Sequence, residues 1–85
     1  MSSSLANPDP RAKEVTVTDD ELLVVLADGR RIAVPLAWFP RLLGATAEER
    51  HHFEILGDGV GIHWPDIDED LSVAGLLRGT PSASR

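Results

Sequence analysis

The stretch ELLVVLADGRRIAV, residues 21–34, decides the fold. It opens with the longest aliphatic run of the chain, residues 22–27, which is apolar on both faces of an extended strand. A six-residue run is also compatible with a buried helix segment, but the paired valines and the flanking turn residues favour a central β-strand. Asp28 and Gly29 then predict a two-residue type I′ hairpin turn, because glycine accepts a positive φ.

Strands are predicted on both sides of this central run. Residues 30–34 return as a third strand, with Ile32 and Val34 facing inward. Residues 14–18 alternate in the pattern of a half-buried strand, with Val15 and Val17 on one face and both threonines on the other. The three segments together predict an antiparallel meander.

A second hairpin is predicted further along the chain. Residues 53–56 and 60–64 have the composition of strands, and Gly57-Asp58-Gly59 between them has the composition of a tight turn. We therefore expect an α+β fold in which an antiparallel sheet of about five strands, a three-strand meander followed by a hairpin, has short helices packed on one face.

The first helical segment contains a proline. Residues 36–43 carry apolar side chains at helical spacing, but Pro40 removes a backbone donor and clashes with the preceding turn inside a helix. We expect a short, distorted helix or one that begins late, ended by Gly44.

Two further helices have recognisable start signals. Thr46 and Glu49 match a capping box, in which each side chain bonds the backbone amide of the other, and the helix that follows is expected to run to about His52. Ser72 is expected to cap a last helix that reaches about Arg78.

Length and composition set the domain organisation. The chain has 85 residues and no cysteine, which suits one domain with neither disulfides nor a thiolate metal site. Residues 1–13 carry three serines and two prolines with little to bury, so we expect a disordered leader there, and residues 80–85 are expected to be a disordered tail. The single α+β domain is predicted over residues 14–79.

The charge balance bears on partners and location. A formal net charge of −6 disfavours direct binding to nucleic acid or to anionic membranes, since both depend on clustered basic residues. The longest apolar run is far shorter than the roughly twenty residues that a spanning helix needs, and residues 1–8 lack the features of a secretory signal. A cytoplasmic location is expected.

Two stretches resemble a known family. They are VPLAWFPRLL with TAEER, at residues 34–43 and 46–50, and ILGDGVGIHWPDIDEDLSV, at residues 55–73. Together with the Asp28-Gly29 turn they resemble the bacterial domain-of-unknown-function 2442 family. The resemblance implies a compact α+β fold and no assigned chemistry. It also implies a possible partner, because genes of this family often lie beside those of another small-protein family in proposed toxin–antitoxin pairs.

The acidic run at residues 66–70 invites a search for a metal site. The candidate ligands are His63, Asp66, Asp68 and Asp70. A calcium loop starting at Asp66 would need glycine where Leu71 stands and glutamate where Leu77 stands, so that motif fails. The alternative interpretation is that these carboxylates precede the helix capped by Ser72, whose amino end favours negative charge. No metal or other cofactor is predicted.

His51 and His52 are expected near the end of a short helix. Adjacent helical residues point about 100° apart, so the two imidazoles do not form an i, i+4 metal pair. A favourable interaction with the carboxyl end of the helix explains at least one of them.

A partner surface is predicted around the second hairpin and the acidic run. Between residues 51 and 77 there are acidic residues but no lysine or arginine, which suits docking of a basic partner; an ordinary solvated face is the alternative. The residues proposed for this surface are Trp38, Arg41, Asp58, His63, Trp64, Asp66, Asp68, Glu69 and Asp70.

These observations favour one functional hypothesis over two others. The leading one is a non-catalytic module that binds another small protein, in the manner of an antitoxin. The alternative is a small metal-dependent enzyme or hydrolase that uses His63 with the nearby aspartates, although no catalytic constellation is recognised. The third is a DNA-associated regulator, which the charge disfavours. A homodimer is also compatible with exposed strand edges.

Overall fold

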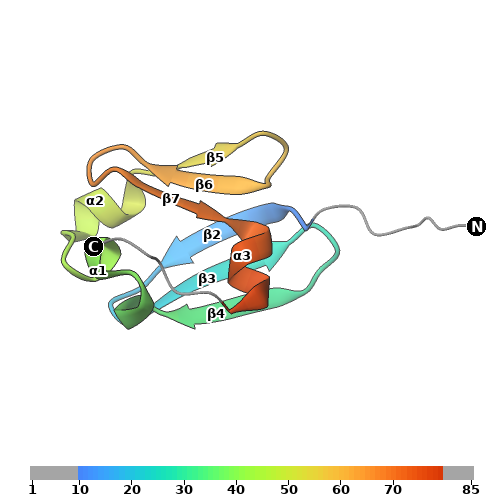
Figure 1. The fold of residues 1–85 in the computed structure, drawn as a ribbon, viewed down its shortest axis with the longest axis horizontal. Helices are drawn as coiled ribbons and strands as arrows, with labels where there is room; N and C mark the ends of the chain where they lie inside the picture. Colours follow the sequence, from blue (N-terminus) through green and yellow to red (C-terminus); the bar gives the residue numbers. More distant parts are fainter. Residues whose placement is uncertain (1–9, 80–85) are drawn as a thin grey trace, which may run out of the picture.

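Within residues 10–79, the fold has two small antiparallel sheets and four short helical segments (Figure 1). The computed structural model describes residues 10–79. The predicted α+β class is confirmed, but the prediction of one sheet of about five strands is wrong, because the strands form two sheets of three. Residues 1–9 of the expected leader over residues 1–13, and the expected tail over residues 80–85, lie outside the described residues. Ala12 and Lys13, at the end of the expected leader, belong to a strand instead.

The first sheet is the predicted meander. Its strands are β2 (Ala12–Val17), β3 (Glu21–Leu26) and β4 (Arg31–Pro35), in the order β2-β3-β4. Leu22, Val24 and Leu26 point into the core, and each is at most 1% exposed. The first strand begins at Ala12, two residues before the expected start at Glu14, and its register shifts between these two residues.

The hairpin between β3 and β4 has a longer turn than predicted. Leu26 N–H donates to the Arg30 carbonyl at 2.7 Å, and Gly29 N–H donates to the Leu26 carbonyl at 2.9 Å. The connection therefore has three residues, and of these only Gly29 has a positive φ, +96°. The prediction of a type I′ turn is therefore wrong, because that turn needs a positive φ at both central residues.

The second sheet contains a strand that was not predicted. Its strands are β5 (Glu54–Leu56), β6 (Gly61–Trp64) and β7 (Glu69–Ser72), in the order β5-β6-β7. β7 takes the last part of the acidic run, which was assigned to the approach to a helix. The turn before it places Asp68 at a φ of +53°, in the left-handed region that aspartate tolerates better than most residues.

The helices follow the predicted start and stop signals. A 3₁₀ turn, η1 (Leu36–Trp38), precedes α1 (Pro40–Leu43), which begins at the proline and ends at Gly44. α2 (Ala47–His51) carries the complete capping box. α3 (Val73–Arg78) is capped by the Ser72 hydroxyl, which accepts from Gly75 N–H at 2.9 Å. None of the helices within residues 10–79 has the length and apolar character needed to cross a membrane.

The core joins both sheets to the helices. Trp64 from β6, Phe39 beside α1 and Val73 from α3 are each at most 1% exposed and belong to one cluster with the inward residues of β3. The Trp64 indole donates to the Arg50 carbonyl at 3.0 Å, so its polar atom is satisfied. Figure 1 shows α3 crossing in front of the first sheet, and α3 contacts both β4 and β7.

Candidate functional site

Three of the four predicted metal candidates are divided between two histidine–carboxylate pairs. His63 and Asp70 are cross-strand neighbours on β6 and β7, and Nδ1 of His63 lies 2.6 Å from Oδ1 of Asp70. Asp66 belongs to the other pair, with Nδ1 of His52 at 2.8 Å from its Oδ2. Asp68 contributes its carbonyl oxygen to a hydrogen bond from Arg41. Within residues 10–79, no group of three metal-ligating side chains is placed to share an ion.

His52 is the functional candidate that the sequence did not reveal. It follows the last residue of α2, and its partner Asp66 lies in the turn between β6 and β7, 14 residues away. The hydrogen bond that His52 Nδ1 donates to the Asp66 carboxylate raises the pKa of His52 above its usual value of 6.5, and the negative charges of Asp66 and Glu54 act in the same direction. His51 is the last residue of α2, and its Nδ1 lies 2.7 Å from the carbonyl of Ala47, the first residue of the same helix.

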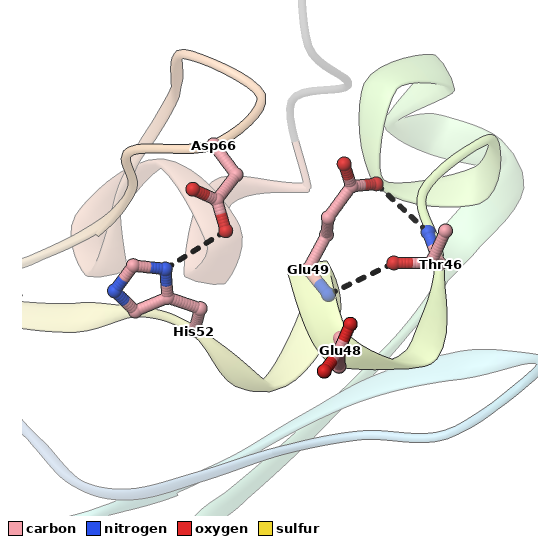
Figure 2. Close-up of a pocket in the computed structure, with 5 residues that line it drawn as sticks. All are labelled: Thr46, Glu48, Glu49, His52 and Asp66. Atoms are coloured by element: carbon pink, nitrogen blue, oxygen red, sulfur yellow. Dashed lines mark hydrogen bonds and ion pairs between the residues drawn. The ribbon is translucent and has the colours of Figure 1, made fainter.

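A shallow acidic hollow lies beside this pair. It has a volume of about 540 Å³ and is lined by Thr46, Glu48, Glu49, His52 and Asp66 (Figure 2). The Thr46 hydroxyl is engaged in the capping box, where it accepts from Glu49 N–H at 3.1 Å. Figure 2 shows the second ring nitrogen of His52 pointing away from Thr46 and both glutamates. The imidazole is therefore not placed to activate that hydroxyl as a nucleophile.

Comparison with known proteins defines the family. The family model described as "Protein of unknown function (DUF2442)" matches residues 12–82. This chain belongs to that family. Among curated proteins no match is found.

Two solved structures of this shape also concern uncharacterised proteins. A crystal structure of a protein of unknown function from Rhodospirillum rubrum is similar with a TM-score of 0.76 and 33% identity, over 91% of this chain and 95% of that one. The solution structure of the uncharacterised protein CV0863 from Chromobacterium violaceum is similar with a TM-score of 0.72 and 25% identity, over 87% and 70% of the two chains. The fold is thus found in other proteins, and neither description gives an activity.

The predicted partner surface of this DUF2442 chain is not one continuous face. Trp64 is 0% exposed and Glu69 is 3% exposed, so the inclusion of these two side chains in an accessible surface was wrong. The reason is that both point from the second sheet into the interior. Asp58 precedes β6 and Asp66 follows it, which puts them at opposite ends of that strand.

The other proposed surface residues have local contacts. Trp38 is half-buried and packs against the core cluster. Arg41 reaches across to the β6–β7 turn, where it donates to Asp68. The Asp58 carboxylate lies 3.1 Å from Arg11 and is 88% exposed. Within the described residues, His63, Asp66, Asp68 and Asp70 thus share one region around the end of the β6–β7 hairpin, and Arg41 reaches it from α1.

The most apolar accessible feature of the second sheet is its outer strand. β5 pairs with β6 on one side only within the described residues, and all three of its residues are exposed. Ile55 is 39% exposed, Leu56 is 41% exposed and the nearby Val60 is 37% exposed. Figure 1 places β5 at the upper margin of the molecule. The sequence predicted this strand but not that its apolar side chains would remain accessible.

Proposed function

We propose that this protein is a non-catalytic module that binds another small protein along the exposed edge of β5. The observation that carries the proposal is that β5 is an edge strand with accessible apolar residues, Ile55 and Leu56, and with one side unpaired in the part of the chain that the structure describes. An open edge offers main-chain donors and acceptors to an added strand. Such an edge is an ordinary place for one protein to receive an extended segment of another.

The side chains along the edge of β5 indicate which residues the partner segment would carry. Successive side chains of a strand point to opposite faces, so Ile55 and Leu56 would each meet an apolar residue of the incoming segment on a different side. Glu54 stands at one end of β5 and Asp58 lies just beyond the other. These carboxylates favour an incoming segment with lysine or arginine near its ends, which would raise the association rate more than the affinity.

The family suggests what kind of small protein this is. The resemblance of the sequence implies a neighbouring gene that encodes a small protein, and an antitoxin that neutralises such a protein in the cytoplasm is the form of the module that we propose. The hydroxyl of Thr46, beside the acidic hollow, and that of Ser72, before α3, both serve as helix caps. The two hydroxyls therefore have a structural role. This supports binding rather than catalysis as the role of the domain.

The experiment is co-expression of the full chain with the product of the adjacent gene, followed by calorimetry on the purified proteins. The double variant Ile55→Lys/Leu56→Lys should weaken the complex at least roughly tenfold, because lysine side chains desolvate poorly at a packed edge. Leu43→Lys is the matched control, since Leu43 is 48% exposed and lies in α1, away from β5. If the double variant binds the partner as tightly as the control does, binding along the edge of β5 is contradicted. Two proteins that elute separately contradict the antitoxin form.

A further inference from the structure

The outer face of the first sheet carries an apolar strip that no helix covers within residues 10–79. Leu22, Val24 and Leu26 face the core, so the alternate residues Leu23 and Val25 point the other way. They are half-buried by their neighbours on the sheet and lie outside the core cluster. A hollow of about 280 Å³ opens on this sheet and is lined by Thr16, Leu23, Val24, Val25, Arg31, Ile32 and Ala33.

Opposite charges flank this strip. In the register of the sheet, Glu14 on β2 pairs with Val25 on β3, and Val25 pairs with Arg31 on β4. One row across the face therefore consists of an acidic residue, an apolar residue and a basic residue. The next row pairs Leu23 with Thr16 on one side and Ala33 on the other. Glu14 and Arg31 are both exposed, and neither forms an ion pair within the described residues.

We infer that this face binds a second copy of the chain. If two such sheets pack face to face about a two-fold axis parallel to the strands, β2 of one copy lies over β4 of the other and β3 lies over β3. Each row then meets the same row of the partner. Val25 and Leu23 pack on their own copies, and each Glu14 faces an Arg31 across the interface. Two sheets packed in this aligned way lie about 10 Å apart, within reach of these long side chains.

The other arrangement of the two sheets lacks this match. Rotation about an axis perpendicular to the strands would place β2 over β2 and exchange the two ends of the face, so Glu14 would no longer meet Arg31. The charge pattern therefore selects one of the two symmetric packings. One like-charge contact remains in the selected packing, because Glu21 at the far end of β3 faces its own copy.

The size of the face sets the strength of the dimer. Three strands span about 14 Å and six residues span about 20 Å, which makes an interface smaller than the roughly 800 Å² per partner of a standard complex. The dimer is therefore weak and forms with rising concentration. It is independent of the proposed function, because it uses the first sheet and leaves β5 in the second sheet accessible.

The first test is sedimentation equilibrium of the full chain up to about 1 mM. A monomer–dimer equilibrium is expected, and Leu23→Lys should abolish it, whereas Leu43→Lys should leave it unchanged. Circular dichroism of both variants checks that they fold. A wild-type chain that stays monomeric over this range overturns the inference. A dimer that is equally strong in Leu23→Lys overturns it as well, since the chain then associates through another surface.

The second test uses the charges. Arg31→Glu and Glu14→Arg should each weaken self-association by roughly tenfold, because two attractive contacts per dimer become repulsive. An equimolar mixture of the two variants should recover the wild-type dimer, since one copy then carries two arginines and the other two glutamates at these positions. Glu21→Gln should tighten the dimer by removing the remaining like-charge contact. A mixture that associates no better than either variant alone contradicts the proposed packing.

Discussion

The Glu69 carboxylate lies inside the molecule, 3% exposed, with its Oε1 3.9 Å from Nη1 of Arg41. Glu69 differs in this burial from the other acidic residues of the same run, which remain at the surface. Arg41 also donates to the Asp68 carbonyl, so one guanidinium holds both the turn before β7 and the first residue of that strand. A buried carboxylate is costly without a compensating charge or hydrogen bond.

Removal of the guanidinium should therefore destabilise the fold. We expect Arg41→Ala to lower the free energy of unfolding by about 1–3 kcal/mol, because it leaves Glu69 without its nearest cation. Arg30→Ala is the matched control, since Arg30 pairs with Asp28 at the surface and should change stability by less than about 0.5 kcal/mol. Urea denaturation of both variants gives the comparison. Equal losses in the two variants would contradict a special role for Arg41.

The His52–Asp66 pair predicts a pH dependence with a definite sign. Asp66 raises the pKa of His52, so the folded protein holds the proton more tightly than the unfolded chain. The stabilisation is complete below about pH 6.5, the unfolded value, and is lost as the pH rises through the higher folded value. A titration of the His52 ring followed by NMR should show the raised pKa in the wild type. Asp66→Asn should lower it, while Asp58→Asn, at the other end of β6, should leave it unchanged.

The two predicted helix caps allow a direct measurement of their contribution. The Thr46 hydroxyl accepts from Glu49 N–H and the Ser72 hydroxyl accepts from Gly75 N–H. Thr46→Ala and Ser72→Ala should each lower the free energy of unfolding by about 1 kcal/mol. Thr46→Ser and Ser72→Asn keep an acceptor at each position and should recover most of that loss. Thermal unfolding of the four variants tests this, and serine or asparagine variants as unstable as the alanine ones would show that the caps do not matter.

These caps also show which features could be predicted from the sequence. The meander, the capping box and the late start of α1 at Pro40 depend on residues within a few positions of each other, so local periodicity and turn chemistry were sufficient. The division into two sheets depends on how distant strands pair, which a single sequence does not reveal. The predicted turn after β3 was placed correctly at Asp28 and Gly29, but it was one residue shorter than the observed turn. The length of the connection depends on which backbone groups form hydrogen bonds, and the two turn residues do not determine this.

The candidate site was harder to predict for a related reason. β7 was missed because glutamate and aspartate are uncommon in strands, and in this chain Arg41 from α1 makes the burial of Glu69 tolerable. His52 and Asp66 are 14 residues apart, and only the packing of α2 beside the β6–β7 turn brings them together. Exposure of Ile55 and Leu56 follows from the position of β5 at the edge of its sheet. In the three-residue strand β5, the local pattern of apolar residues was too short to show whether the strand lies at the edge or in the centre of its sheet.

The junction of the two sheets provides the last prediction. Ala12 N–H donates to the Gly59 carbonyl at 2.7 Å, which connects the start of β2 to the loop between β5 and β6. Gly59 has a φ of +106°, and a Cβ added there would lie 2.7 Å from the Ala12 carbonyl oxygen and 2.9 Å from its nitrogen. Gly29 has a similar φ of +96°, but a Cβ added there would meet nothing within 4 Å.

The two glycines therefore separate backbone strain from steric overlap. Gly29→Ala should cost about 1–2 kcal/mol, the penalty for a positive φ in a residue with a Cβ. Gly59→Ala has the same penalty plus the overlap with a backbone that cannot move without opening the junction, so it should cost about 1–3 kcal/mol more. Urea denaturation of both variants measures the difference. A Gly59→Ala protein as stable as Gly29→Ala would mean that the Ala12 strand end moves away freely, and that the hydrogen bond between Ala12 and Gly59 contributes little to holding the two sheets together.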